Sequence, residues 1–189
     1  KRAGLLGRVF QDPMQGTAAK MSVSENLALA ARRGKHRGLR WGLPKVESQE
    51  FTKALEMLGL GLERRLDDKI GLLSGGQRQA ITLIMATMQK PKLLLLDEHT
   101  AALDPKTAAK VLDITDQVVN QSQLTTLMIT HNMNDAIRHG NRLIMMDEGR
   151  IILDIQGEEK KKLTVDQLLK LFAQAGGENA LSDRMLLHN

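Results

Sequence analysis

The run PKLLLLDE at residues 91–98 limits the fold of this chain more than any other stretch. Four leucines stand between a proline and two carboxylates, and a short apolar run with such flanks is typical of a strand that is buried on both faces. Strands of this kind form parallel sheets whose faces are covered by helices. We therefore predict an α/β fold with a parallel sheet that contains residues 93–96.

Further strands and helices are predicted to alternate with this run. LLGRVF (5–10) predicts a strand before it, and LTTLMIT (124–130) predicts another strand after it. One helix is predicted after Gly76, and a second begins at the N-cap residue Asp104 and the proline that follows it. This alternation over residues 77–155 favours a parallel α/β core, and RLIMMDEGRIILDI at its end predicts a hairpin.

Residues 14–72 are predicted to form a mostly helical lobe. Ser22 and Glu25 make a capping box at the start of one helix, and residues 46–58 carry apolar side chains at helical spacing. The run at residues 31–45 holds six Lys and Arg and no acid. Such a run suits lipid headgroups, nucleic acid or an acidic partner, and its simplest interpretation is a solvated loop. A single aromatic residue within it disfavours nucleic acid.

Composition excludes several classes of protein and site. The 189 residues include no Cys, which excludes disulfides and thiolate metal sites. No apolar run reaches the roughly 18–20 residues that cross a bilayer, and the five His show no spacing typical of zinc ligands. Only 2% of the residues are aromatic, so aliphatic side chains and ten Met must fill the core.

Polar side chains collect where the predicted strands end. Parallel α/β sheets bind ligands at the carboxyl ends of their strands, and here these ends carry Gln11, Asp97, Glu98 and His131. A strand-end Asp can hold Mg²⁺ and a following Glu can polarise a water, although two carboxylates can also cap the next turn. Gln11 suits a water or Mg²⁺ ligand and His131 can donate to a phosphate; taken singly, each is more simply a solvated or structural residue.

LSGGQRQA at residues 73–80 has the features of an anion-binding corner. Ser74, Gly75 and Gly76 stand directly before a predicted helix, and the first backbone N–H groups of a helix have no partner within it. The sequence nevertheless contains no phosphate-cradling GxxxxGK[ST] loop. An anion site is thus predicted without a nucleotide-binding loop of its own.

Together these stretches resemble the nucleotide-binding subunit of ATP-binding-cassette (ABC) transporters. Five motifs occur in the order that this family has: VFQDP with Gln11 as the Q-loop, LSGGQRQA as the ABC signature, LLLLDE as Walker B, AALDP as the D-loop, and His131 as the switch histidine. They extend from about residue 8 to residue 131, most of the chain. The resemblance implies a P-loop NTPase fold of the ABC ATPase type, a parallel sheet with an inserted helical subdomain.

The resemblance also implies a role for each matched residue. Two subunits would pack head to tail with ATP and Mg²⁺ between them, and the signature would contact the γ-phosphate in trans, with glycine there because a Cβ would block the approach of the backbone. Glu98 would act as general base, His131 would hold the γ-phosphate, and Asp104 would lie at the dimer interface. The implied residues are, for cofactor binding, Ser74, Gly75, Gly76, Gln77 and Asp104; for Mg²⁺, Asp97 and Gln11; and for catalysis, Glu98, His131 and Gln11.

The sequence departs from the family pattern upstream of Gln11. In the family, the Walker A loop and an aromatic residue that stacks on adenine lie there, but only ten residues precede Gln11. The resemblance therefore implies an N-terminally truncated subunit that carries the closing half of each composite ATP site. We expect negligible ATP hydrolysis by residues 1–189 alone, and an apolar sheet surface left uncovered by the missing strand.

The implied organisation has four parts: residues 1–13, a core strand and the Q-loop; 14–76, the helical subdomain ending in the signature; 77–155, a RecA-like core; and 156–189, a C-terminal helix and tail. The implied partners are a second ABC ATPase subunit, a transmembrane permease and an extracytoplasmic substrate-binding protein, with no nucleic acid, at the cytoplasmic face of the membrane. DEHTAALDPKTA resembles bacterial importers, some of whose relatives are associated with aromatic amino acids such as tryptophan. The alternative is a soluble ABC ATPase acting in translation or DNA maintenance, although residues 12–73 leave no room for the coiled coil of DNA-maintenance members.

Overall fold

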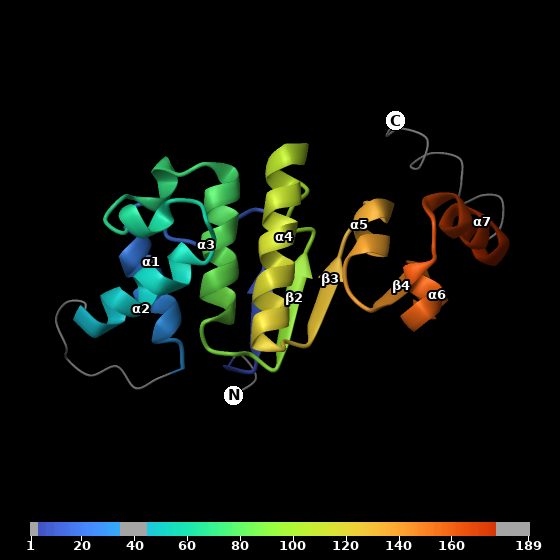
Figure 1. The fold of residues 1–189 in the computed structure, drawn as a ribbon, viewed down its shortest axis with the longest axis horizontal. Coiled ribbons are helices and arrows are strands. Elements are labelled where there is room, and N and C mark those ends of the chain that lie inside the picture. Colours follow the sequence, from blue (N-terminus) through green and yellow to red (C-terminus); the bar gives the residue numbers. More distant parts are fainter. Residues whose placement is uncertain (1–3, 35–44, 177–189) are drawn as a thin grey trace. The chain divides into compact units, whose positions relative to one another are not determined.

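The computed structural model describes residues 4–34 and 45–176. The chain forms two compact units, Lys1–Ile129 and Thr130–Asn189. In its described part, the first unit contains a parallel sheet and a helical lobe, and the second contains a hairpin with flanking helices (Figure 1).

The first unit is built on a parallel sheet, as the sequence predicts. Strands β1 (Leu6–Val9), β2 (Leu93–Asp97) and β3 (Thr126–Ile129) pair in the order β1-β2-β3. Helix α3 (Gly75–Thr87) precedes β2, and helix α4 (Pro105–Ser122) connects β2 to β3. Both helices contribute buried side chains to one core with the sheet (Figure 1). The strand–helix alternation in the sequence is therefore the alternation of this sheet with its covering helices.

The leucine strand β2 is fully buried on one face only, which corrects the prediction of a strand buried on both faces. Leu94 and Leu96 are 0% and 1% exposed and belong to the core with α3 and α4, whereas the two leucines that alternate with them are half-buried. On β3, Leu127 and Ile129 share the second face by their register and are 50% and 53% exposed. An apolar sheet surface is therefore exposed in the first unit.

Helix α1 (Val23–Ala31) begins at the predicted capping box. The Glu25 N–H donates to the Ser22 Oγ at 3.1 Å, and the Ser22 N–H donates to the Glu25 carboxylate at 2.7 Å. These two bonds satisfy backbone donors that a helix start otherwise leaves unpaired.

The rest of the helical lobe leads from α1 to the signature motif. Helix α2 (Lys45–Glu56) is followed by the single 3₁₀ turns η2 (Leu62–Arg64) and η3 (Ile70–Leu72), and buried apolar side chains from all of them join those of α3. Residues 35–44, most of the basic run at 31–45, lie outside the described residues.

Strand β1 approaches α3 closely because residue 7 is glycine. A Cβ built on Gly7 would stand 2.6 Å from the carbonyl oxygen of Ala86 in α3. Since real Cβ atoms do not approach backbone oxygens so closely, a larger residue would push the strand away from the helix. This packing lays the end of β1, where the Q-loop motif begins, along the first turns of α3, where the signature lies.

The second unit is organised around the predicted hairpin. Strands β4 (Arg142–Asp147) and β5 (Arg150–Gln156) pair antiparallel. Glu148 and Gly149 connect them with φ values of 45° and 77°, the two positive values that a tight hairpin turn needs. The helices described in this unit are α5 (Met133–Arg138), α6 (Gly157–Lys161) and α7 (Val165–Gly176).

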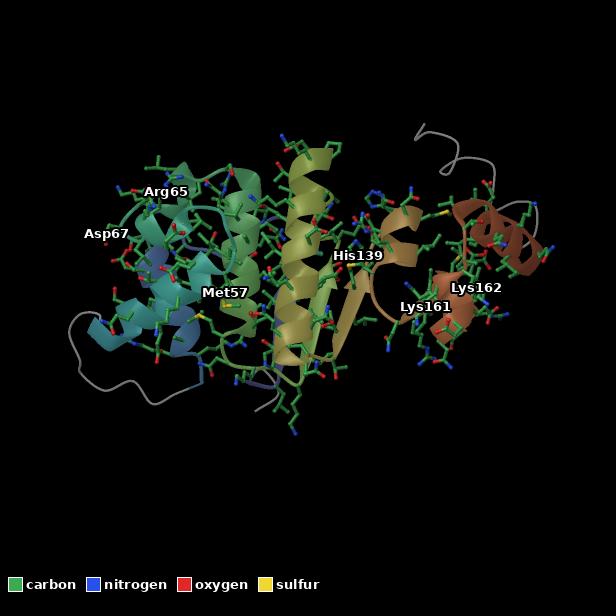
Figure 2. The ribbon with its side chains drawn as sticks, viewed as in Figure 1. Met57, Arg65, Asp67, His139, Lys161 and Lys162 are labelled. Carbon is green, nitrogen blue, oxygen red and sulfur yellow. The ribbon has the colours of Figure 1, made fainter. Side chains whose placement is uncertain are left out.

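Helix α6 was not predicted, because residues 157–163 read as a polar run. In the structure Lys160 is only 3% exposed, and its ammonium donates to three backbone carbonyls around the end of α5, among them that of His139 at 2.9 Å. The last carbonyls of a helix have no partner within it, so a cation is well placed there. The neighbouring Lys161 and Lys162 are exposed (Figure 2). Lys160 is buried, and Lys161 and Lys162 are not, because Lys160 is the one that reaches the carbonyls at the end of α5.

Candidate functional site

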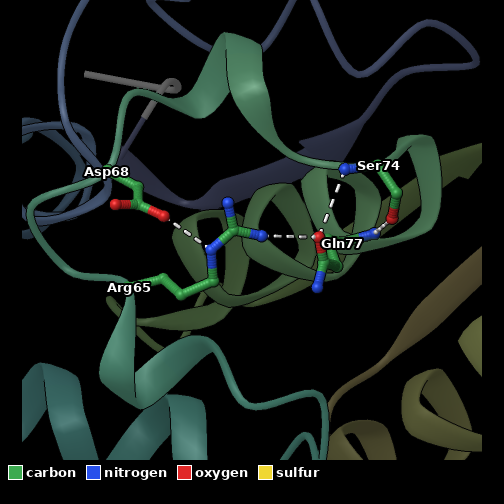
Figure 3. Close-up of polar contacts among 4 residues, drawn as sticks. All are labelled: Arg65, Asp68, Ser74 and Gln77. Carbon is green, nitrogen blue, oxygen red and sulfur yellow. Dashed lines mark hydrogen bonds and ion pairs between the residues drawn. The ribbon is translucent and has the colours of Figure 1, made fainter.

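The signature motif forms a hydrogen-bonded corner at the start of α3 (Figure 3). Ser74 is the N-cap of this helix: its Oγ accepts the backbone N–H of Gln77 at 3.3 Å, and its own N–H donates to the Gln77 Oε1 at 3.2 Å. The predicted helix is confirmed, but it begins two residues earlier than predicted, because Gly75 and Gly76 belong to its first turn. Because the Oγ accepts this bond with one lone pair, the Ser74 hydroxyl proton remains available to donate.

Arg65 fixes the orientation of the Gln77 amide. Its guanidinium donates to the Gln77 Oε1 at 3.3 Å and is held by Asp68 at 2.6 Å (Figure 3). Since Oε1 accepts from both Arg65 and Ser74, the –NH₂ group points away from both. The corner therefore presents donors, namely a hydroxyl, an amide and the first backbone N–H groups of α3, an arrangement suited to an anion.

The two signature glycines pack against the D-loop and the first turn of α4. A Cβ on Gly75 would stand 3.2 Å from Cδ2 of Leu103, and a Cβ on Gly76 would stand 2.1 Å from Cγ2 of Thr107. The sequence suggests that these glycines admit a phosphate. The structure adds a reason within the chain, because a Cβ at Gly76 could be accommodated only if Thr107 shifted.

Asp104 of the D-loop motif is the predicted N-cap of α4. Its carboxylate accepts the backbone N–H of Thr107 at 3.1 Å. Hydrogen bonds from Thr107, from its side chain first and its backbone second, hold the pKa of Asp104 below its ordinary value. The carboxylate is exposed, and the same Thr107 packs on Gly76. The signature and the D-loop are thus neighbours within one chain.

Gln11 and Asp97 line one open hollow at the ends of β1 and β2. The hollow has a volume of about 540 Å³, and its lining consists of Arg8, Phe10, Gln11, Asp12, Gln15, Asp97 and Ala102. Arg8 donates to the Asp97 carboxylate at 2.7 Å, and its guanidinium stacks 4.5 Å from the centroid of the Phe10 ring. Both partners are partly exposed, so the ion pair contributes at most about 1 kcal/mol to stability. Its consequence is positional: it holds the Asp97 carboxylate beside the Q-loop.

Glu98 has a backbone conformation that L-residues rarely adopt. Its φ is 44°, in the left-handed region, and it is held by two backbone bonds of 3.0 Å, one to the Ile129 carbonyl and one from the Ala101 N–H. Left-handed backbone costs of order 1–3 kcal/mol and persists where the surroundings over-determine it. Such strain clusters at functional positions, which is consistent with the predicted role of this carboxylate.

The structure brings some of the predicted residues together within the first unit. Gln11 and Asp97 share the hollow, and Ser74 and Gln77 share the signature corner. His131 belongs to the second unit, where it is exposed and directly precedes Asn132, the N-cap of α5.

Three residues of these sites were not identified from the sequence. Arg8 interrupts an apolar strand, and a charge at such a position signals a partner on the neighbouring strand. Gln79, whose side chain donates to the Phe10 carbonyl, is a polar residue amid the apolar side chains of α3, a signal for a buried hydrogen bond. Arg65 lies in an irregular segment, where no pattern in the sequence indicated its contact with Gln77.

Comparison with known proteins supports the interpretation of these motifs. The family described as "ABC transporter" matches residues 2–101. A tyrosine transport ATP-binding protein of Clostridioides difficile is 47% identical over 175 residues, which cover 93% of this chain and 69% of that protein. The chain belongs to the ABC transporter family.

Other members of the ABC transporter family agree in sequence and fold. The phosphonates import ATP-binding protein PhnC of Bordetella parapertussis is 32% identical over 93% of this chain and 66% of its own length. A Clostridium perfringens protein of the ABC transporter complex cbiONQ superposes with a TM-score of 0.69 at 25% identity, over 91% of this chain and 64% of that one. A dimeric ATP-binding cassette bound to ADP and Pi superposes with a TM-score of 0.64 at 28% identity, over 80% of this chain and 62% of that one. The P-loop NTPase fold of the ABC type is thereby confirmed.

This ABC transporter chain spans about two thirds of the length of these relatives. Among residues 4–34 and 45–176, no helix has the length and apolar character needed to cross a membrane. The same residues contain no cluster of three or more His, Cys, Asp or Glu that could hold a metal ion.

Proposed function

We propose that this chain acts in an ATPase that powers import across a bacterial membrane, and that its signature corner closes an ATP molecule held by a second subunit. The observation that carries the proposal is the set of donors at Ser74. The hydroxyl proton of Ser74 and the adjacent –NH₂ of Gln77 are not used by the hydrogen bonds that hold the corner. The N–H groups of Gly75 and Gly76 open a helix and lack partners within it. A γ-phosphate matches these donors in charge and geometry.

The hollow at Gln11 and Asp97 would serve the opposite half of such a site. Mg²⁺ in nucleotide sites takes one or two protein oxygens and fills its shell with water and phosphate. The Asp97 carboxylate and the Gln11 amide oxygen, two of the polar groups that line the hollow, fit that requirement. Asp97 and Gln11 would hold the ion, whose charge would offset that of the phosphates. To bind there, the ion must share or displace the Arg8 guanidinium.

The remaining roles concern the attacking water and the second subunit. Glu98 would accept or orient the proton of the water, in the strained backbone position that keeps its carboxyl near the end of β2. His131 would donate to the γ-phosphate, and Asp104 would contact the partner subunit. Phosphoryl transfer of this kind depends on positioning and electrostatics rather than covalent catalysis.

The partners and the substrate class are proposed by analogy with relatives. Import ATP-binding proteins among them favour a second ATPase subunit, a transmembrane permease and an extracytoplasmic binding protein, with the chain at the cytoplasmic face of the membrane. Relatives named for tyrosine transport and methionine import favour an amino acid as the substrate.

Affinity purification of the tagged chain from its native cells tests the transport function. We expect an integral membrane permease to co-purify in detergent, and ATP hydrolysis by that complex to be abolished by Glu98→Gln while the complex stays intact. Recovery with ribosomes instead of a permease would overturn the proposal. For residues 1–189 alone we expect no turnover above background, and a turnover that Glu98→Gln removes would contradict the view that the chain supplies only part of each ATP site.

A further inference from the structure

One buried side chain of α3, Gln79, connects the signature helix to the Q-loop motif. Gln79 is 0% exposed, and its Nε2 donates to the carbonyl oxygen of Phe10 at 3.0 Å, 69 residues away in the sequence. Strand β1 ends at Val9, so this carbonyl lies beyond the strand ladder. It is also the last backbone acceptor before Gln11. The bond therefore fixes the point at which the chain leaves the sheet.

Other contacts place the same surface of α3 along residues 10–16. One nitrogen of Arg78 lies 2.8 Å from the sulfur of Met14. A Cβ on Gly16 would stand 3.4 Å from the methyl of Thr82. These two contacts involve the ends of side chains, which can move without a change in the backbone. Gln79 instead binds the backbone carbonyl of Phe10 through a directional hydrogen bond.

The Gln79 amide is only half satisfied. Its Oε1 is buried and has no hydrogen-bond partner among the residues that the structure describes. A buried acceptor without a donor costs free energy, so the Nε2 bond to Phe10 is what offsets the burial of this amide.

We propose that Gln79 is a positioning residue that couples the Q-loop to the signature corner, so that Gln11 and Ser74 shift together. The helix makes this coupling mechanically direct, because Ser74 caps α3 and Gln79 lies within its first two turns. A displacement of Phe10 is transmitted through Gln79 to the helix that carries the corner. The coupling rests on the proposed function, in which both ends contact nucleotide.

Hydrogen exchange of the 189-residue chain tests the link without nucleotide. Gln79→Met keeps the side-chain volume and removes the donor, and we expect exchange at residues 11–16 to become about five-fold faster, the effect of one lost hydrogen bond. Gln79→His keeps an Nε2 donor at similar reach, and we expect it to restore the slow rate. The matched control is Gln89→Met, since Gln89 donates to the Ala30 and Ala31 carbonyls at the end of α1 instead. It should leave residues 11–16 unchanged.

Unchanged exchange in Gln79→Met, or an equal increase in Gln89→Met, would overturn the link. If Gln79→Met fails to fold, the comparison of Gln79→His with Gln79→Leu decides, because leucine has no donor. In the permease complex, Gln79→Met should lower kcat for ATP several-fold with little change in KM, and an unchanged kcat would refute the coupling. Retention of hydrolysis in Glu98→Gln would instead count against the proposed function alone.

Discussion

The contact between Gly76 and Thr107 makes a quantitative prediction about the signature motif. In Gly76→Ala the new Cβ would stand 2.1 Å from Cγ2 of Thr107, far inside the contact distance of two carbons, and its next neighbour would lie at 3.7 Å. Overpacking of this kind costs about 1–3 kcal/mol. Alanine regains up to about 1 kcal/mol of helix propensity. We therefore expect Gly76→Ala to lower the free energy of unfolding by about 2 kcal/mol, which corresponds to a Tm lower by roughly 4–8 °C.

A double-mutant cycle isolates this single contact. Thr107→Ser removes Cγ2 but keeps the hydroxyl that bonds Asp104, so Gly76→Ala in that background should be neutral or slightly stabilising. Urea unfolding of the four chains should give a coupling energy of about 2–3 kcal/mol. Gly75→Ala is the neighbouring control, because its Cβ meets only the flexible end of Leu103 and should cost less. A coupling energy below about 0.5 kcal/mol would refute the reasoning.

Three further predictions concern strain, burial and pH. Glu98→Gly should raise the free energy of unfolding by up to about 1 kcal/mol, because glycine adopts positive φ without strain, and it should abolish hydrolysis in the complex. Gln123 also has positive φ, so Gln123→Gly should stabilise the chain as well, but without affecting hydrolysis. If thermal unfolding shows that neither variant is more stable than the wild type, the reasoning about strain is wrong. Lys160→Met should destabilise the second unit by about 2 kcal/mol, because three backbone carbonyls lose their donor. Hydrogen exchange in α5 and α6 should therefore become faster, and unaltered exchange would be inconsistent with this role of Lys160. The pKa of Asp104 is lowered on folding, so its stabilisation is present above about pH 4 and lost as the pH falls through the folded pKa. The Tm difference between the wild type and Asp104→Ala should therefore shrink between pH 6 and pH 3, and a constant difference would argue against it.

Much of the fold could be predicted because its signals are local. A capping box needs only Ser22 and Glu25 three residues apart, and the N-cap at Asp104 needs only the residues that follow it. The hairpin turn at Glu148 and Gly149 is likewise decided by its own two residues. The sequence analysis overestimated the burial of β2, because a run of four leucines does not show whether one face or both faces of the sheet are covered.

In the candidate site, local sequence signals identified residues but not their contacts. The order of the motifs identified Ser74, Asp97 and Glu98 as candidates, because each follows or precedes a predicted element in a characteristic way. Their surroundings were decided by the packing of segments that are distant in the sequence. The register of β1 on β2 places Arg8 beside Asp97, and the close approach of α3 to β1 places Gln79 beside Phe10. The sequence shows which chemical groups the chain carries. The distances between groups that are remote in the sequence are set only when the helices and strands pack, and the electrostatics of this site depend on those distances.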